Sequence, residues 1–262
     1  MRTLKLTLSY DGTAYAGWQV QPRQSTLQGT FEAALAKITG ETIRVTASGR
    51  TDAGVHALGQ VVSFDTQSGM SADVFLRALN AELPHDMVVL DSVDAAPGFH
   101  AIRDAVRKRY RYVLHDGPIP DVFRRQYAWH YRQRLDAEAM QRAAKNLLGT
   151  HDFRSFETGW PQRTSSVRTV FDLTVQRGQH ETCDLIAVEI EADGFLYNMV
   201  RSIVGTLVEV GRGTRPESWP EEVLAAQDRR AAGMTAPAHG LFLLRVEYNG
   251  KTTEGERPTA DD

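Results

Sequence analysis

Residues 47–57 read Ala47-Ser48-Gly49-Arg50-Thr51-Asp52-Ala53-Gly54-Val55-His56-Ala57, with an Arg-Thr-Asp core between two glycines. Glycine lets the backbone turn sharply and lets a bound molecule approach closely. An aspartate on such a loop can act as a nucleophile or as a base. The same pattern also fits an Asx turn, in which the carboxylate only caps its own turn. These residues alone leave both a catalytic and a structural role open for Asp52.

The segments around this loop alternate between strand and helix patterns. Apolar residues at every second position predict strands, and apolar residues three and four apart predict helices. Residues 1–104 contain strand patterns at Thr3–Tyr10, Ile43–Ala47, Gln60–Asp65 and Met87–Val93, a helix bearing Leu27, Phe31, Leu35 and Ile38, and a helix capped by Ser71. The predicted order is therefore β-α-β-β-α-β.

Residues 105–248 repeat this order. They contain strand patterns at Lys108–Leu114, Val170–Arg177, Asp184–Glu191 and Leu241–Tyr248, and helical patterns at Ala137–Leu148, Phe195–Val210 and Glu221–Ala226. Such a unit is the ferredoxin-like split βαβ arrangement. The sequence thus predicts an α+β fold in which two ferredoxin-like halves, 1–104 and 105–248, form a mainly antiparallel sheet with helices packed on it. Residues 249–262 are expected to form a polar, frayed tail.

The composition is that of a folded globular protein, with 42% hydrophobic and 24% charged residues. No apolar run reaches the length of a membrane span, and the N-terminus lacks the apolar region of a signal peptide, so a soluble cytoplasmic protein is expected. The single cysteine, Cys183, excludes an internal disulfide and a multi-cysteine zinc site. We expect Cys183 to lie inside a strand, and we expect no metal, because no two histidines have helical metal-ligand spacing.

The charge is unevenly distributed along the chain. Residues 103–168 carry 14 basic and 7 acidic side chains, a net of +7, whereas the whole chain has a net charge of −3. A locally basic region can hold a polyanion despite a negative total. Within this region Arg107-Lys108-Arg109-Tyr110-Arg111-Tyr112 alternates cations with aromatic residues, which suits a nucleic acid with stacking bases. The alternative is an edge strand with solvated arginines on one face and two core tyrosines on the other.

A single arginine, Arg201, interrupts the nearly apolar stretch 194–205. A buried charge costs several kcal/mol unless it is paired, so this pattern predicts a carboxylate partner elsewhere in the chain. The alternative is that the Arg201 side chain reaches water at the edge of an ordinary core helix.

These segments together resemble the tRNA pseudouridine synthase A family from Leu4 to Tyr248. The octapeptide 49–56 is similar to the signature of that family nearly without departure. Further motifs follow in the same order as in the family: Phe99-His100-Ala101, Arg109-Tyr110-Arg111-Tyr112, Asp152-Phe153, Met199-Val200-Arg201, Pro216-Glu217-Ser218-Trp219 and Gly240-Leu241. The resemblance favours the catalytic role for Asp52.

The resemblance implies an isomerase that converts uridine to pseudouridine in the anticodon stem-loop of tRNA, around nucleotides 38 to 40, with no cofactor and no metal. It implies that Asp52 is the nucleophile, that Tyr110 stacks against the target base and that Arg201 pairs with Asp52. Arg50 is a candidate for filling the gap left by the extruded base. The resemblance also implies a homodimer whose two chains build a basic cleft for one tRNA.

The chemistry of this reaction is compatible with these residues. The glycosidic bond breaks, the base rotates and a carbon of the base rejoins the ribose, so the base must leave the stack and stay enclosed. Asp52 could attack the ribose, attack the base or abstract a proton, and the sequence does not choose among these. An ionised Asp52 beside Arg201 is expected to have a pKa below about 3.9.

Two other functions remain open. A non-catalytic RNA-binding protein could share the fold, although the combination of Asp52, Tyr110 and Arg201 argues against it. A different uridine-modifying enzyme, such as a methyltransferase, would need a nucleotide site. The sequence has no glycine-rich nucleotide loop after a predicted strand.

Overall fold

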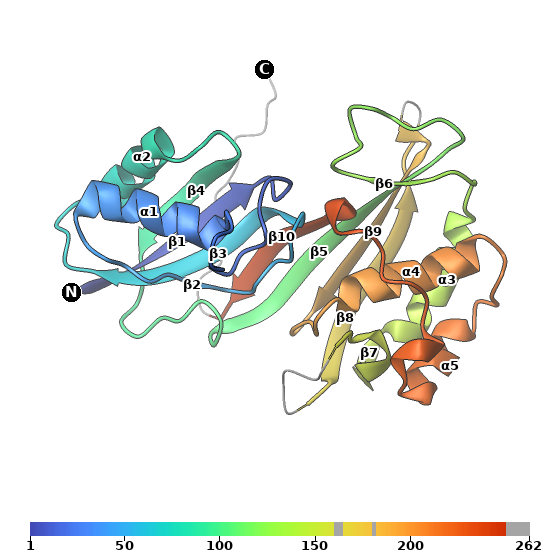
Figure 1. Ribbon diagram of the computed structural model, residues 1–262. Coiled ribbons are helices and arrows are strands. Elements are labelled where there is room, and N and C mark those ends of the chain that lie inside the picture. The colour runs from blue at the N-terminus through green and yellow to red at the C-terminus, as the bar shows by residue number, and fades with distance from the viewer. Residues whose placement is uncertain (160–164, 180–181, 250–262) are drawn as a thin grey trace, which may run out of the picture.

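The computed structural model describes residues 1–159, 165–179 and 182–249. Within these ranges the chain folds into one ten-stranded sheet with helices packed against it (Figure 1). The strands follow the order β4-β1-β3-β10-β5-β9-β8-β7, with β2 paired to β3 and β6 paired to β5. Residues 250–262 of the expected polar tail lie outside the described residues, as does Arg163 of the basic region.

The strands are β1 (Arg2–Tyr10), β2 (Thr46–Ala47), β3 (His56–Thr66), β4 (Met87–Asp94), β5 (Ala105–Asp116), β6 (Trp129–Tyr131), β7 (Gly149–Asp152), β8 (Val167–Arg177), β9 (Leu185–Ala192) and β10 (Leu241–Tyr248). The α-helices are α1 (Leu27–Thr39), α2 (Ala72–Glu82), α3 (Ala137–Ala144), α4 (Met199–Gly211) and α5 (Trp219–Ala226).

Each half of the sheet has the strand order expected of a ferredoxin-like unit. The first half runs β4-β1-β3 with β2 beside β3, and the second runs β10-β5-β9-β8. Strand β10, the last strand of the described residues, also pairs in parallel with β3 through Phe242 opposite His56 and Leu243 opposite Ala57. The predicted fold class is therefore confirmed, and β10 joins the halves into one sheet. The division at residue 104 into two domains stays a prediction.

The helices form two groups over the sheet. Figure 1 shows α1 and α2 beside the part made of β1, β3 and β4, and α3, α4 and α5 beside the part made of β5, β8 and β9. Fully buried side chains such as Leu6, Phe31 and Leu207 fill the space between helices and strands. Burial of each such side chain contributes about 1.5–3 kcal/mol to stability. The central strands β10 and β5 lie between the two groups.

Several predicted element boundaries are wrong. The strand predicted at Ile43–Ala47 is reduced to β2, and the helix predicted at Ala137–Leu148 ends at Ala144, where the chain tightens into a 3-10 turn at Lys145–Leu147. The helix predicted from Phe195 begins only at Met199, because Asn198 adopts a left-handed conformation with φ of 62°. Cys183 is exposed in the turn before β9 and does not lie inside a strand.

Candidate active site

The loop that carries Asp52 connects β2 to β3 and is anchored by both halves of the molecule. Gln60 of β3 donates a hydrogen bond from Nε2 to the carbonyl oxygen of Gly49 over 2.9 Å. Lys108 of β5 donates from Nζ to the carbonyl oxygen of Ser48 over 2.6 Å. After Asp52 the chain turns back at once, since the Val55 amide donates to the Asp52 carbonyl and Gly54 has a φ of +77°. Asp52 thus sits at the tip of a fixed turn.

A second loop packs closely against this turn. The amide of Trp18 donates to the carbonyl oxygen of Thr51 over 2.9 Å. Gly17 has a φ of +97°, and a Cβ added there would lie 2.9 Å from the same oxygen, so a larger residue would push the loops apart. The hydroxyl of Thr51 is buried against the hydroxyl of Tyr10 at 2.9 Å. These contacts fix the backbone next to Asp52.

Arg201, in the first turn of α4, faces Asp52. Its Nη1 lies 3.5 Å from Oδ2 of Asp52. The side chain of Arg201 is 17% exposed and that of Asp52 is 33% exposed. Arg201 also donates from Nε to the carbonyl of Ala236 over 2.6 Å and from Nη1 to Oδ1 of Asn198 over 2.7 Å. The predicted carboxylate partner of Arg201 is thus present in the structure. The pair is looser than a tight charge-assisted hydrogen bond of about 2.7–2.9 Å.

The pKa of Asp52 is raised above its ordinary value, which contradicts the expectation of a lowered pKa. Burial of the carboxyl group disfavours its ionised form, and the attraction and hydrogen bond of Arg201 only partly offset this. At 3.5 Å the contact is too loose for Arg201 to offset fully the effect of burial on the pKa of Asp52.

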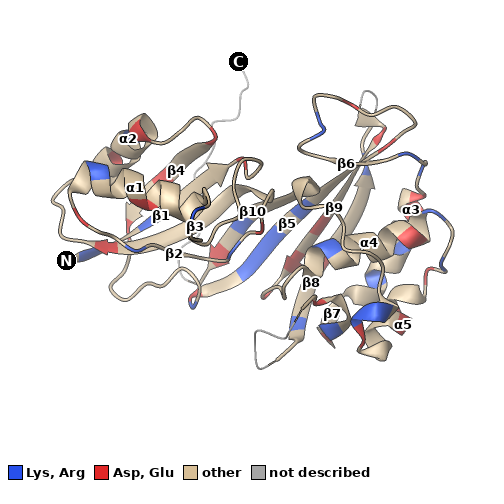
Figure 2. Cartoon of the chain, viewed as in Figure 1, with Lys and Arg blue, Asp and Glu red and all other residues tan. Residues whose placement is uncertain are grey.

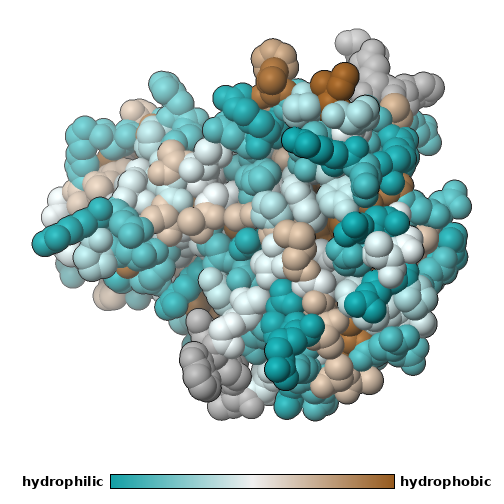
Figure 3. Space-filling view, turned by 45° about the vertical axis from the view of Figure 1, so that its right-hand side comes forward, coloured by the Kyte–Doolittle hydropathy of each residue, from teal (hydrophilic) through white to brown (hydrophobic). Residues whose placement is uncertain are grey.

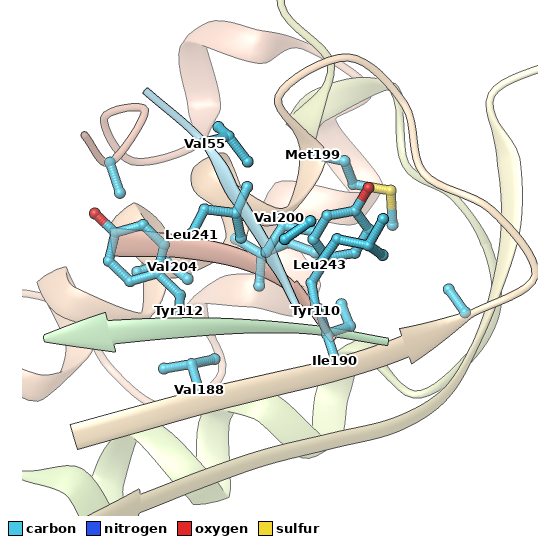
Figure 4. Close-up of a cluster of buried hydrophobic side chains, with 14 of the residues drawn as sticks. Val55, Tyr110, Tyr112, Val188, Ile190, Met199, Val200, Val204, Leu241 and Leu243 are labelled. Atoms are coloured by element: carbon cyan, nitrogen blue, oxygen red, sulfur yellow. The ribbon is translucent and has the colours of Figure 1, made fainter. Parts of the chain in front are cut away.

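Tyr110 of β5 lies on the same side of the sheet as Asp52. Its side chain is 8% exposed, and its ring meets that of Phe195 edge to face, with centroids 5.0 Å apart. Figure 4 shows Tyr110 and Tyr112 among apolar side chains that include Met199 and Leu241. Burial raises the pKa of Tyr110, and its hydroxyl has no hydrogen-bond partner within the described part of the chain. Tyr112 lies deeper, at 0% exposure, and donates its hydroxyl to the carbonyl of Pro237.

A cleft of about 500 Å³ contains all four predicted site residues, Arg50, Asp52, Tyr110 and Arg201. Its other lining residues are Ser48, Gly49, Thr51, Val55, Ile102, Lys108, Glu157, Phe195, Leu196, Tyr197, Asn198, Met199, Val200 and Leu241. Arg50 is exposed, and its side chain has no hydrogen bond or ion pair with any residue that the structure describes. The cleft is mixed in polarity and large enough for a nucleoside.

The arginines of β5 point away from this cleft. Arg109 and Arg111 project from the opposite face of the sheet and pair with carboxylates of β8 and β9. Figure 2 shows the basic positions of β5 in blue beside acidic positions in red on the neighbouring strands. Strand β5 is also an interior strand rather than an edge strand. Both arginines are therefore paired and lie outside the cleft, with Arg109 largely buried and Arg111 partly exposed. Only the tyrosine face of this segment contributes to the candidate site.

Among the described residues, no group of three or more His, Cys, Asp or Glu side chains could hold a metal ion. No helix in the described ranges has the length and apolar character needed to cross a bilayer.

Comparison with known proteins identifies the family. A sequence profile described as tRNA pseudouridine synthase matches residues 7–102 and 143–249. The chain belongs to the tRNA pseudouridine synthase family. It is 51% identical over 253 residues to a tRNA pseudouridine synthase A from Moorella thermoacetica, covering 95% of this chain and 100% of that protein. It is 46% identical over 248 residues to the tRNA pseudouridine synthase A of Bacillus subtilis, covering 94% and 99%. The members of this family are isomerases that act on RNA.

Three of the cleft residues that were not predicted as site residues, Lys108, Glu157 and Asn198, carry charged or amide side chains. Lys108 and Asn198 each stand next to one of the family motifs. Asparagine adopts the left-handed backbone conformation more readily than most residues, so its place before a helical pattern was a signal for Asn198. Glu157 is 7% exposed and accepts a hydrogen bond from the Ser166 hydroxyl. No local sequence pattern distinguishes Glu157 from a surface glutamate.

Proposed function

We propose that this chain isomerises uridine to pseudouridine in the anticodon stem-loop of tRNA, around nucleotides 38 to 40, with Asp52 as the nucleophile on a flipped-out base. The observation that carries this proposal is the convergence of three groups on one cleft. The carboxylate of Asp52, the guanidinium of Arg201 and the ring of Tyr110 come from three distant segments. Convergent polar groups in a partly apolar cleft are typical of an active site.

The three groups have complementary roles in this proposal. The reaction breaks the bond between ribose and base nitrogen and forms one between the same ribose carbon and a carbon of the base. Asp52 attacks as a carboxylate, and the bond that it forms breaks again before the product leaves. The ring carbon that joins the ribose loses its proton and the freed ring nitrogen gains one, so product and substrate are isomers. The positive charge of Arg201 stabilises the ionised form of Asp52 against the effect of burial. The flat face of Tyr110 holds the detached ring, because aromatic side chains stack on any base.

Arg50 has a separate role outside the chemical step. Extrusion of a base costs a few kcal/mol of stacking and pairing, which a side chain entering the vacated space can partly recover. Arg50 lines the cleft two residues before Asp52 and is exposed. Its guanidinium is therefore suited to occupy the gap in the RNA.

Mapping of the product tests the proposal. Purified protein is incubated with unmodified tRNA transcript, and pseudouridine is mapped at each position. We expect modification around nucleotides 38 to 40, and none there when these uridines are replaced by cytidine. Modification confined to another arm of the tRNA would contradict the proposed substrate site.

We also propose that the chain acts as a homodimer in the cytoplasm, where its tRNA substrate is found. The segment between β5 and β6 supports a self-association surface, because Ile119, Val122 and Phe123 are 76%, 61% and 86% exposed. Figure 3 shows strongly hydrophobic residues at the top of the molecule, where this segment lies in Figure 1. Exposed apolar clusters of this kind commonly mark protein contacts.

Sedimentation of the wild type and of Phe123→Ser tests the dimer. We expect a dimer at micromolar concentration for the wild type and dissociation in the variant. A fully active wild-type monomer would contradict the dimer, and an unchanged dimer in the variant would exclude this surface.

A further inference from the structure

His56, the first residue of β3, lies four residues after Asp52 and is 1% exposed. Its Nε2 is 2.9 Å from the carbonyl oxygen of Gln126 and 3.2 Å from that of His239. Carbonyl oxygens only accept hydrogen bonds, so Nε2 must carry the proton. This nitrogen therefore ties the start of β3 to two segments of the second half.

The other ring nitrogen contacts the first half. Nδ1 of His56 lies 3.1 Å from the amide nitrogen of Gly12 and 3.0 Å from Oδ1 of Asp11. In the neutral ring Nδ1 accepts from the Gly12 amide, and in the protonated ring it donates to Asp11. Either form holds the turn at Asp11 and Gly12 in place.

That turn rests directly on the loop of Asp52. A Cβ added at Gly12 would lie 2.0 Å from the carbonyl oxygen of Val55, so the two backbones are in close contact. On its outer side, Asp11 accepts a hydrogen bond from the hydroxyl of Tyr127 over 2.6 Å. These contacts form a closed ring, because Tyr127 is the next residue after Gln126, whose carbonyl oxygen accepts from Nε2 of His56.

Ring contacts complete the enclosure of His56. The imidazole stacks on Phe242 of β10 with centroids 4.7 Å apart and an interplanar angle of 23°. On another side it meets the ring of Tyr127 at 5.2 Å. His56 is thus surrounded by residues of both halves, at the point where β3 pairs with β10.

We infer that His56 is a positioning residue for the proposed reaction: it fixes the Asp52 loop relative to the second half, which supplies Arg201 and Tyr110. The inference rests on the proposed role of Asp52. Arg201 meets Asp52 at only 3.5 Å, so this pair alone does not lock the carboxylate. The contact of Lys108 with this loop and the pairing of β3 with β10 already connect the halves. His56 adds a further link through Gln126 and His239. Loss of this link weakens the hold on the Asp52 loop and allows it to shift relative to Arg201.

The size of the effect follows from the sensitivity of catalysis to geometry. A displacement of about 1 Å can cost roughly 100-fold in rate. A shift confined to the Asp52 loop moves only Arg50 among the residues that we propose to contact the RNA outside the chemical step. We therefore expect His56→Ala to lower the single-turnover rate roughly 100-fold while the Kd for tRNA transcript changes less than about threefold.

Two conservative variants separate the roles of the two ring nitrogens of His56. His56→Gln can return a donor near the position of Nε2, and His56→Asn can return a polar group near that of Nδ1. The inference predicts that His56→Gln recovers part of the rate, because Nε2 makes the link to the second half. Tyr127→Phe removes only the outer hydrogen bond to Asp11 and should cause a smaller rate loss, without the cavity that His56→Ala creates.

His115→Gln is the matched control, because His115 is also a buried histidine, at 7% exposure, and does not line the cleft. It should keep the wild-type single-turnover rate. Melting temperatures of all variants identify losses that come from unfolding. The inference is overturned if folded His56→Ala keeps the wild-type rate, if His56→Gln is no faster than His56→Ala, or if rate and tRNA affinity fall together. Activity retained in Asp52→Asn would instead overturn the proposed function, which separates the two failures.

Discussion

Strand β5 carries tyrosines on one face and arginines on the other, and the two faces have different surroundings. Tyr110 and Tyr112 both enter the interior, where Tyr110 lines the cleft of Asp52 and Tyr112 lies in the core outside it. Arg109 and Arg111, which alternate with them, lie against acidic residues of β8 and β9 on the reverse of the sheet. Alternation along a strand places neighbouring residues on opposite faces. One strand thus serves the candidate site with one face and the stability of the sheet with the other.

The reverse face is an ion-pair network centred on Arg109. This side chain donates to Asp172, Glu189 and Glu191 over 2.7, 3.1 and 3.0 Å. Arg245 of β10 also donates to Glu191, over 2.8 Å, so the network spans the central strands. A connected network with good geometry contributes more than isolated surface pairs do. We therefore expect substitutions on the tyrosine face of β5 to lower turnover, and substitutions on the arginine face to lower stability without lowering turnover.

The largest difference is expected between Tyr110→Ala and Tyr112→Ala. Loss of the Tyr110 ring removes stacking worth about 1–3 kcal/mol, so turnover of the folded variant should fall roughly 5- to 150-fold. Because the ring is only 8% exposed, its loss also lowers the melting temperature. Loss of the fully buried Tyr112 ring should cost about 3–5 kcal/mol of stability. Turnover and thermal melting are measured for both variants, with Tyr110→Phe as a control that keeps the ring face. Equal losses of turnover among molecules that remain folded would remove the distinction between the two positions.

A smaller effect, on stability alone, is expected for Arg109→Gln. The change leaves Glu191, whose side chain is 7% exposed, with fewer donors. We expect a loss of about 1–3 kcal/mol in the free energy of unfolding, measured by urea denaturation. Single-turnover activity should stay within about twofold of wild type, because the side chain lies on the face away from the cleft. A tenfold loss of activity in the folded variant would mean that the faces are not independent.

The smallest perturbation is a change of pH. Burial raises the pKa of Asp52, so its reactive carboxylate is lost, as pH falls, at a higher pH than for an ordinary aspartate near about 3.9. For Glu189 and Glu191 burial acts in the same direction, but hydrogen bonds and charges of the arginines prevail and hold both pKa values below the ordinary value. Their stabilising contribution is present above about 4.3 and is lost only as pH falls through the lowered pKa values. As the pH falls, activity should be lost at a higher pH than the one at which the protein unfolds. Initial rates follow the activity, and circular dichroism follows the unfolding. Loss of both at the same pH would contradict the assignment.

Local patterns predicted the order of the main elements, because apolar spacing reports which face of each strand or helix is buried. They missed the short strands β6 and β7, which have three and four residues and show no clear alternation. They also predicted that Arg201 needs a carboxylate, since an arginine within an apolar helix must be paired. The start of α4 was missed because the left-handed backbone of Asn198 has no periodic signature. The direction of the Asp52 pKa shift was wrong because it depends on the balance between burial and a 3.5 Å contact. The partners of the β5 arginines come from strands more than 60 residues away in sequence, so no local pattern reveals them.

Asp52→Asn, measured beside Arg109→Gln, tests the central claim most directly. Asparagine keeps the shape of the turn but is neither a nucleophile nor a base at neutral pH. The substitution removes a partly buried ionised carboxylate but leaves Arg201 without its carboxylate partner, so the Asn variant should melt close to wild type. We predict that single-turnover pseudouridine formation on a tRNA transcript is abolished in Asp52→Asn, with tRNA affinity retained in filter binding. Residual activity within about tenfold of wild type would contradict the assignment of Asp52 as the catalytic residue.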